Sequence, residues 1–456
     1  MNPKISWRSG LALSVLLVSV ALTACGYKST TYSRASTAVA LARYNANGTP
    51  DTANLVGGTG LVTTDVNTSQ DDIAFAVVRQ PVDGKIIAVG TSFTTPANVV
   101  VTRYNANGTL DSSFGTNGIT VTSLPSADAS AFAATLQADG KLLVAGRSCA
   151  SSGATGFLLL RYTTSGALDT DPITGFGGGT GIVTTGIPSG VSTSANAVAV
   201  SGTNILVAGH SKIGLRFVIA LAQYTSSGTP DSTFGSGGIV TTPVGSLDAD
   251  AAALAVQTDG KIVAAGLAGS FASQIWDVAL LRYNTDGTLD LPFGGTNTGM
   301  VITDIGSSSN YANAVAIQGD GKIVVVGNAF VNSFAGTSDI AVLRYNTDGS
   351  PDTAGFGIPN GYVTTNVSAF DNGFAVAVQP DNKIVVAGNA DAGSGDRLAL
   401  LRYTANGSLD TDPDPTRGFG GGTGIVTRAA SGPSIIAGAF AVVLQPGGEI
   451  VVVGYD

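Results

Sequence analysis

The chain has 456 residues, with 22 lysines and arginines against 31 aspartates and glutamates, which gives a formal net charge of −9. Glycine occurs 62 times and Glu449 is the only glutamate, so the abundance of turn-forming glycine and aspartate excludes a mostly helical protein. The acidic balance without a basic run excludes nucleic-acid binding, and a hydrophobic content of 44% excludes intrinsic disorder.

The N-terminus has the pattern of an export signal. Lys4 and Arg8 precede an apolar stretch over 11–21. This stretch is shorter than the roughly 20 residues that a membrane-spanning helix needs. It leads into Leu-Thr-Ala-Cys over 22–25, which resembles the bacterial lipobox. The resemblance implies cleavage before Cys25 and acylation of that cysteine, whereas an ordinary secretory signal would leave it unmodified.

Acylation of Cys25 predicts an exported bacterial lipoprotein that contacts the membrane through its lipid. By resemblance to Gram-negative lipoproteins, Gly26 in place of aspartate favours the outer membrane, with the protein facing the periplasm or the cell surface. Cys149 is the only other cysteine, so an acylated Cys25 would leave no intramolecular disulfide. The expected organisation is a signal peptide over 1–24, a lipidated cysteine and tether over 25–37, and one domain over 38–456.

Three markers recur seven times along the rest of the chain. A tyrosine follows arginine or glutamine at Tyr44, Tyr104, Tyr162, Tyr224, Tyr283, Tyr345 and Tyr403. A glycine closes an apolar run at Gly90, Gly146, Gly209, Gly266, Gly327, Gly388 and Gly454. Another opens a short Val/Ile/Thr run at Gly60, Gly118, Gly181, Gly238, Gly299, Gly361 and Gly424. Three markers with one period of about 60 residues predict seven copies of one structural unit.

Each copy is interpreted as four short strands. The first is the Val/Ile/Thr run, the second alternates small and larger apolar residues as in 74–77, and the third is continuously apolar as in 323–326. The fourth ends in Arg-Tyr, as in 343–345, and an Asp-Gly turn such as 320–321 joins the second strand to the third. Four-stranded units at this period predict an all-β, seven-bladed β-propeller with antiparallel blades.

The two ends of the chain complement each other. Residues 38–44 form a fourth strand without a first three, and 424–454 hold three strands without a fourth. We therefore expect the N-terminal strand to join the last blade and close the ring, which removes an exposed edge. The alternative is an outer-membrane barrel, suggested by a mean hydropathy of +0.30. Barrel strands alternate apolar and polar residues, whereas the third strands here are apolar throughout.

The repeat carries a specific motif of the form RYNTDGTLD…FG…GIVTT…AVAVQ.DGKIVVAG. It is most complete over 282–327 and 344–388. This motif resembles the delta-60 repeat family, and the resemblance covers about 36–456. It implies a propeller in an exported bacterial protein, and it supplies no established activity or catalytic residue.

The most regular polar feature is an arginine followed eight residues later by an aspartate. Seven equivalent positions cannot all line one active site. We therefore expect each arginine to tie the loop after its strand to that loop's aspartate through charge-assisted hydrogen bonds. The fourth copy has Gln223 with Asp231 instead. The six pairs are Arg43/Asp51, Arg103/Asp111, Arg161/Asp169, Arg282/Asp290, Arg344/Asp352 and Arg402/Asp410.

Calcium is the one metal that the sequence suggests. Asp410, Asp412 and Asp414 place carboxylates at alternate positions, as calcium loops do. The Asn-x-Asp-Gly segments at 284–287 and 346–349 also fit, but they stand where a tight turn is expected. No other cofactor is expected, because a single histidine cannot build a histidine-rich metal site.

One group of loops departs from the repeat and is a candidate ligand surface. These loops connect the third and fourth strands of three consecutive blades, so they should be neighbours on one face. Alternatively, their aromatic rings cover blade edges and complete the packing. The candidate residues are His210, Lys212, Arg216, Phe271, Trp276, Phe330 and Phe334.

Together these features predict a lipid-anchored, monomeric propeller of the cell envelope. Its expected role is to bind or scaffold a protein or glycan partner without catalysis. The alternative is a propeller hydrolase or lyase that acts on envelope or extracellular polysaccharide, with aspartates at the channel mouth as its catalytic groups.

Overall fold

The computed structural model describes residues 37–456 except 69, 126, 274, 307, 333–335, 392–395, 415 and 430–437. The predicted export signal, Cys25 and the predicted tether up to residue 36 lie outside the described residues. Regular structure in the described part is β, apart from short helical turns at Gly357–Gly361 and Gly420–Gly422. Within the same part of the chain, no helix combines the length and apolar character needed to cross a membrane.

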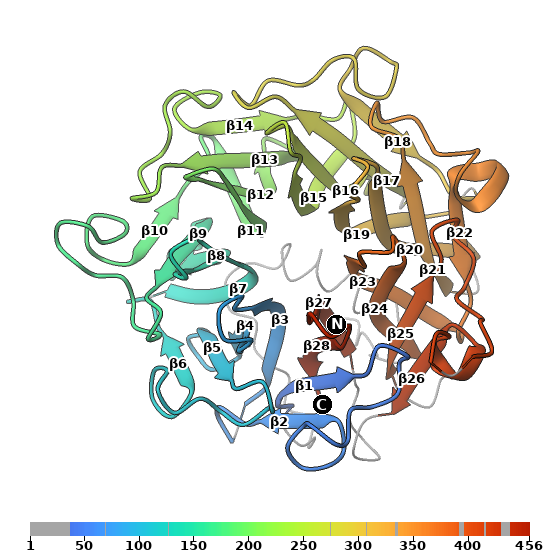
Figure 1. The fold of residues 1–456 in the computed structure, drawn as a ribbon. Coiled ribbons are helices and arrows are strands. Elements are labelled where there is room, and N and C mark those ends of the chain that lie inside the picture. The colour runs from blue at the N-terminus through green and yellow to red at the C-terminus, as the bar shows by residue number, and fades with distance from the viewer. Residues whose placement is uncertain are drawn as a thin grey trace, which may run out of the picture.

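The strands form antiparallel units of four, arranged around a common centre (Figure 1). The innermost strands are β3 (Asp72–Arg79), β7 (Ala127–Leu136), β11 (Gly190–Ser201), β15 (Asp248–Val256), β19 (Asn310–Ile317), β23 (Phe370–Val378) and β27 (Gly438–Leu444). The second strands are β4 (Ile86–Ser92), β8 (Leu142–Ala150), β12 (Asn204–Ile213), β16 (Ile262–Ser270), β20 (Ile323–Asn332), β24 (Ile384–Asp391) and β28 (Ile450–Tyr455).

The third strands carry the recurrent tyrosines at their ends. They are β1 (Val39–Tyr44), β5 (Asn98–Tyr104), β9 (Thr155–Tyr162), β13 (Arg216–Tyr224), β17 (Ile275–Tyr283), β21 (Thr337–Tyr345) and β25 (Asp396–Tyr403). The outermost strands are β2 (Leu61–Thr64), β6 (Ile119–Thr122), β10 (Ile182–Thr185), β14 (Ile239–Thr242), β18 (Met300–Thr303), β22 (Tyr362–Thr365) and β26 (Ile425–Ala429).

Each unit pairs its strands from the innermost to the outermost. The units β19–β22 and β23–β26 are linked into one larger sheet by a single parallel bridge between Ser338 and Phe370. No sheet of described strands closes on itself. The prediction of an all-β protein built from four-stranded antiparallel units is therefore confirmed.

The sheet that joins the two chain ends differs from the predicted one. It contains β27 and β28 from the C-terminus and β1 and β2 from the N-terminus, in the order β2-β1-β28-β27. The sequence predicted three C-terminal strands and one N-terminal strand. The error arises because each Val/Ile/Thr strand pairs with the Arg-Tyr strand before it, as Leu343 of β21 pairs with Tyr362 of β22.

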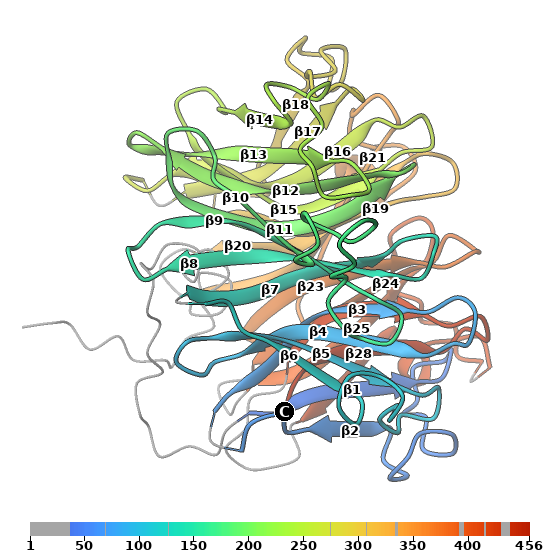
Figure 2. The same cartoon turned by 90° about the vertical axis from the view of Figure 1, so that its left-hand side faces the viewer.

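The core lies between the sheets. The second and third strands are buried along their whole length in β4 and β1, because each sheet has a neighbour on either face. Seen from the side, the sheets lie one over the next (Figure 2). One typical cluster joins Leu143 and Phe157 of one unit to Ile205 and Ala220 of the next. The seven recurrent tyrosines are at most 1% exposed.

Candidate ligand site at the innermost strands

Every innermost strand carries a β-bulge at the same place. In β3, Ala74 pairs with Gly90 and Ala76 with Val89, so Phe75 is an extra residue without a partner. The same register shift recurs in β7, β11, β15, β19, β23 and β27. We call the seven extra residues the bulged residues: Phe75, Phe132, Asn196, Ala252, Asn313, Phe374 and Phe440.

The glycine that closes each apolar run makes the bulge possible. A Cβ on Gly90 would lie 1.8 Å from the carbonyl oxygen of Ile73, and a Cβ on Gly327 would lie 1.7 Å from that of Tyr311. Because no side chain fits there, glycine is required opposite each bulge. The recurrent glycine is therefore explained by the geometry of the innermost strands.

Four bulged residues form an aromatic arc across four successive units. The Phe75 ring lies 5.2 Å from that of Phe440 and 5.7 Å from that of Phe132. The Phe374 ring lies 5.0 Å from that of Phe440, on which Tyr455 also stacks at 5.6 Å. Phe75 and Phe132 are half-buried, whereas Phe374 and Phe440 are buried.

The other three bulged residues form a polar arc. Asn196 donates from Nδ2 to Oδ1 of Asp250 at 2.9 Å and to the carbonyl of Ala251 at 3.0 Å, both in the next unit. Asn313 donates in the same way to the carbonyl of Gly373 at 2.8 Å. Ala252 is the bulged residue of the unit between those of the two asparagines. The innermost strands thus present one aromatic side and one amide-bearing side.

The structure places His210 next to the polar arc. It lies inside β12 and is 2% exposed, not in a surface loop as the sequence suggested. Its Nδ1 lies 3.0 Å from Oδ1 of Asp250, but neither Nδ1 nor Nε2 makes a hydrogen bond among the described residues. Its ring packs edge to face on Phe217 at 5.3 Å.

The remaining loop candidates are only partly brought together. Phe271 is 46% exposed and packs on Trp276 at 4.8 Å, while Trp276 and Phe330 are buried inside β17 and β20. Lys212 stands over the Phe217 ring at 5.7 Å, and Arg216 is exposed. Phe334 lies outside the described residues. The predicted exposed aromatic surface is not what the structure shows, because the strands run on through most of these residues.

In each Arg–Asp pair the two side chains are in direct contact. The pairs lie at the ends of the strands opposite to the bulged residues. Arg344 donates from Nε to Asp352 at 2.8 Å, and Lys322 approaches the same carboxylate at 2.7 Å. Arg344 also donates to the carbonyl of Ala405 in the next unit at 2.6 Å. Equivalent pairs and bonds to the next unit are Arg43/Asp51 with Ala106, Arg103/Asp111 with Thr164, Arg161/Asp169 with Ser226, Arg282/Asp290 with Thr347, and Arg402/Asp410 with Ala46.

Asp169 accepts from Arg161 at 2.6 Å, as predicted, and also from Lys141 at 3.0 Å. The added lysine matches the one that approaches Asp352. Its loop is also longer than in the second copy. The carbonyl of Asp169 accepts from the amide of Phe176, seven residues on, whereas that of Asp111 accepts from Phe114, three residues on. Asp169 is 4% exposed, so it is a structural residue and not a free carboxylate.

The cations lower the pKa of carboxylates in several of these loops. Burial alone would raise the pKa of Asp352, but the hydrogen bonds from Lys322 and Arg344 outweigh it and lower that pKa below its usual value. The same balance lowers the pKa of Asp290 and of Asp410. Such an arrangement holds a loop in place and offers no free acid or base.

The candidate calcium ligands are also held by cations. The Asp410 carboxylate accepts from Arg402 and Lys383, while Asp412 and Asp414 face Arg417 at 3.5 and 3.1 Å. Among the described residues, no three acidic, histidine or cysteine side chains gather into a metal-binding group. Calcium binding here stays a prediction, and it would require Asp412 and Asp414 to exchange Arg417 for the ion.

A second recurrent contact joins neighbouring units near their outer edges. The Tyr345 hydroxyl lies 2.7 Å from that of Thr303, and five other tyrosines meet the last threonine of the preceding outermost strand in the same way. The seventh tyrosine, Tyr44, faces Arg428 instead. Burial raises the pKa of Tyr44 to about 12, although the Arg428 charge acts to lower it.

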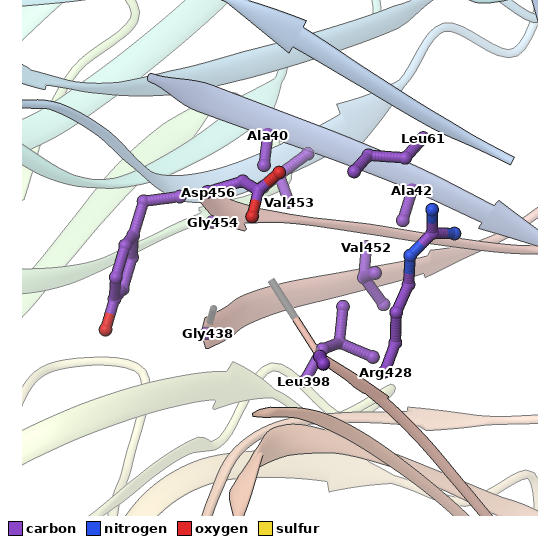
Figure 3. A pocket seen from close by; sticks show the side chains of 12 residues that line it. Ala40, Ala42, Leu61, Leu398, Arg428, Gly438, Val452, Val453, Gly454 and Asp456 are labelled. Carbon is purple, nitrogen blue, oxygen red and sulfur yellow. The ribbon is translucent and has the colours of Figure 1, made fainter. Parts of the chain in front are cut away.

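A crevice opens beside this seventh junction (Figure 3). Its walls come from Ala40, Leu61 and Val452 on one side and from Leu398 and Arg428 on the other. The lining is apolar apart from Arg428, Tyr455 and Asp456. No group in it is arranged for chemistry, so we assign it no ligand.

Sequence reasoning missed the bulged residues. Each stands between two small residues, as in Ala74-Phe75-Ala76 and Ala195-Asn196-Ala197. Comparing this one position across the seven copies would have revealed that its chemistry changes while its neighbours stay small. That comparison was the available signal.

The fold and the repeats define a β-propeller. The chain belongs to the family described as "Domain of unknown function (DUF5122) beta-propeller", which matches just over half of the chain. Among curated proteins, none matches the sequence. The seven matched segments are residues 29–53, 83–114, 137–171, 204–234, 257–293, 318–354 and 379–412.

The chain is also similar to solved structures of other proteins, at low sequence identity. An ulvan lyase of polysaccharide lyase family PL25 is 13% identical with a TM-score of 0.45, covering 74% of this chain and 82% of that chain. The periplasmic gluconolactonase PpgL of Pseudomonas aeruginosa is 12% identical with a TM-score of 0.45, covering 88% and 99%. Sqt1 of Chaetomium thermophilum is 13% identical with a TM-score of 0.41, covering 84% and 96%. Such distant likeness says nothing about function.

Proposed function

We propose that this protein is a non-catalytic binding module of the cell envelope and that its ligand contacts the bulged residues. One observation carries the proposal: the same bulge recurs in all seven innermost strands, yet its side chain is aromatic in four, an amide in two and alanine in one. Positions that serve the fold repeat their residue, as the glycine opposite each bulge does. A position with fixed geometry and varied chemistry is suited to recognition.

We further propose that the domain over 38–456 is a closed ring of seven blades. β27 contacts β3 as other neighbouring innermost strands contact each other. The backbone amide of Gly420 donates to the carbonyl of Asn47 at 3.0 Å, and that of Val56 donates to the carbonyl of Asn107 at 2.7 Å. Both bonds repeat an internal one, in which the amide of Gly294 donates to the carbonyl of Asp348 at 2.8 Å. The two junctions that involve the chain ends are thus built like the internal ones.

A lipid anchor at Cys25 would place the bulged residues toward the membrane. The amide of Thr37 donates to Asp71 at 2.9 Å, beside the start of β3 and three residues before its bulge begins. Twelve residue steps separate Cys25 from Thr37. At about 3.3 Å per step, the anchored domain stays within roughly 40 Å of its membrane. We place this lipoprotein in the outer membrane, facing the periplasm or the surface.

The state of the cysteines tests the anchor directly. Cys149 is buried in β8, and the sequence holds only one other cysteine, Cys25. A disulfide between the two and acylation of Cys25 exclude each other. Mass spectrometry of the protein from its native membrane should find a diacylglyceryl thioether on Cys25. A peptide pair linked through both cysteines would contradict the anchor.

Site-specific photocrosslinking tests the binding site. p-Benzoylphenylalanine is placed at Ala252, the half-buried alanine among the bulged residues, or at Ala138, an exposed alanine in a turn at the opposite end of the strands. In intact cells, irradiation should give a discrete adduct from position 252 and none from position 138. No adduct from 252, or an adduct from 138 alone, would contradict the proposal.

A second candidate function is polysaccharide hydrolysis or elimination. It is favoured by the short distance of 3.0 Å between His210 Nδ1 and Asp250 Oδ1 beside the polar arc, because a histidine close to a carboxylate can act as a general base. The test is the release of new chain ends from envelope polysaccharide by the purified protein. Turnover that is lost in Asp250→Asn while the melting temperature is unchanged would support this function.

A further inference from the structure

We infer that the ligand of the bulged residues is an uncharged glycan, whose sugar rings stack on the aromatic arc and hydrogen-bond to the polar arc. This inference rests on the proposed function and names the class of ligand for the same site. A sugar ring carries C–H groups on its faces and hydroxyls around its rim. It therefore needs an apolar surface beside a set of polar groups.

The aromatic arc supplies the apolar surface. Phe132, Phe75, Phe440 and Phe374 lie in an unbroken sequence of ring contacts between 5.0 and 5.7 Å. Phe75 and Phe132 keep part of their surface accessible. The negative faces of such rings attract the weakly positive C–H groups of a sugar, as they attract other polarised hydrogens.

Buried polar groups that lack partners lie beside the bulged residues. His210 Nε2, Asn328 Nδ2 and Asn372 Oδ1 make no hydrogen bond among the described residues, although their residues are at most 2% exposed. Asn328 and Asn372 are adjacent to the bulged residues, because Asn313 donates to Asn328 at 3.3 Å and Asn372 precedes Gly373 and Phe374.

An unpartnered buried polar atom costs about 1–3 kcal/mol of stability. Hydroxyl groups can satisfy donors and acceptors alike, since each donates one hydrogen and accepts two. The three unpartnered groups include at least one donor and one acceptor. The hydroxyls around a sugar ring can form hydrogen bonds with both. A purely apolar ligand, such as an acyl chain, would leave all of them unsatisfied.

The charges at the site favour a neutral glycan. No bulged residue is charged, and Asp250 adds a carboxylate to the polar arc. Arg147 occupies the position of the repeat that is equivalent to His210, because it follows Gly146 as His210 follows Gly209. It is buried, and its charge interacts with Asp128. An acidic sugar would therefore be repelled by the Asp250 carboxylate.

The experiment is binding of the purified protein to an array of neutral hexasaccharides of glucose, galactose, mannose, xylose and arabinose, with uncharged peptides beside them. We expect at least one hexasaccharide to bind. Phe75→Ala and Asn196→Ala should each weaken that binding about tenfold, as loss of a central contact does. Phe271→Ala is the matched control, because Phe271 is an exposed aromatic residue outside the bulged residues, and its binding should not change.

Folding is checked by the melting temperature of each variant. If Phe75→Ala does not fold, Phe132→Leu replaces it, because leucine keeps the apolar volume of a half-buried position and removes the ring. Absence of binding to every hexasaccharide, or binding that the ring substitution leaves unchanged, would overturn the inference. An adduct at position 252 that contains protein and no sugar would overturn it while leaving the proposed binding module intact.

Discussion

The guanidinium of Arg402 donates a hydrogen bond to the backbone carbonyl of Ala46, 356 residues away in the sequence. The same bond joins neighbouring units in the middle of the chain, as from Arg344 to Ala405. The seam between the two ends of the chain is therefore stabilised by the contacts that stabilise the internal junctions.

The seam gives the first prediction. A chain that starts at residue 66 lacks β1 and β2, which leaves β28 with an unpaired edge and breaks the contacts of Arg402 and Gly420. We expect it to aggregate or to melt without a cooperative transition. The matched control starts at residue 37 and should melt as one cooperative unit. Equal melting of the two chains, followed by circular dichroism, would contradict a closed ring.

The second prediction concerns the ion pairs. Arg344→Ala leaves the carboxylate of Asp352, which is 4% exposed, with Lys322 as its only cation and should cost about 3 kcal/mol. The double variant Arg344→Gln/Lys322→Asn copies the arrangement in which Gln223 and Asn204 hold Asp231. It should cost clearly less in urea unfolding. If the double variant is the less stable of the two, the pairs do not act as we describe.

Acid should destabilise the fold through the same carboxylates. The pKa of Asp352, Asp290 and Asp410 is lower in the folded chain than the usual 3.8, so the folded state holds fewer protons. Their contribution is complete above pH about 4 and is lost as the pH falls through the folded values. Melting temperatures should drop steeply below pH 4. Asp352→Asn should melt lower at pH 7 and show a shallower drop, and an unchanged slope would count against this assignment.

Asp277 should behave in the opposite way. Burial, with a further contribution from the Asp304 charge, raises the pKa of Asp277, and its Oδ1 has no hydrogen-bond partner. A raised pKa means that this charged carboxylate lowers stability at neutral pH and that protonation relieves the cost. Asp277→Asn should therefore melt at the same temperature or higher at pH 7. A melting temperature well below wild type would show that the charged form is stabilising.

The glycine opposite a bulge can be tested by two matched substitutions. Gly327→Ala puts a methyl group 1.7 Å from the carbonyl oxygen of Tyr311, whereas nothing lies within 4 Å of a Cβ on Gly319. Gly327→Ala should cost more than about 4 kcal/mol or prevent folding. Gly319→Ala should be neutral or stabilise by up to about 1 kcal/mol. Similar stability of the two variants in urea would rule out the bulge as described.

Much of the fold follows from the sequence because its markers are structural requirements. Tyr345 is fully buried against Thr303, and Gly327 opposes a bulge, so both residues recur at one period. The grouping of strands into units could not be read in this way. A strand such as β22 is equally close in sequence to the strands before and after it, and only hydrogen bonding shows that it pairs with β21.

The lysine partners of the aspartates were also missed. Asp169 was predicted to contact Arg161, eight residues earlier, but it also accepts from Lys141, 28 residues earlier. Lys141 belongs to the turn before β8, and nothing in the spacing of the motif shows that this turn reaches the loop after β9. The contact becomes visible only when β8 and β9 pair side by side.

The candidate site was harder to predict because it depends on contacts between units. His210 looked like a loop residue, but β12 continues through it, and its partner Asp250 is supplied by the next sheet. Phe75 and Phe440 are far apart in sequence and touch only because β3 and β27 are neighbours. Spacing within one repeat carries no information about either contact.

The most direct test of the account compares photocrosslinking at position 252 in two backgrounds, wild type and Phe75→Ala/Phe440→Ala. If the ligand contacts the bulged residues, loss of two central aromatic side chains should reduce the yield of the adduct at least about tenfold. The yield at position 252 in a Phe271→Ala background should stay at the wild-type level. An adduct of undiminished yield in the double variant would contradict the claim that these residues form the binding site.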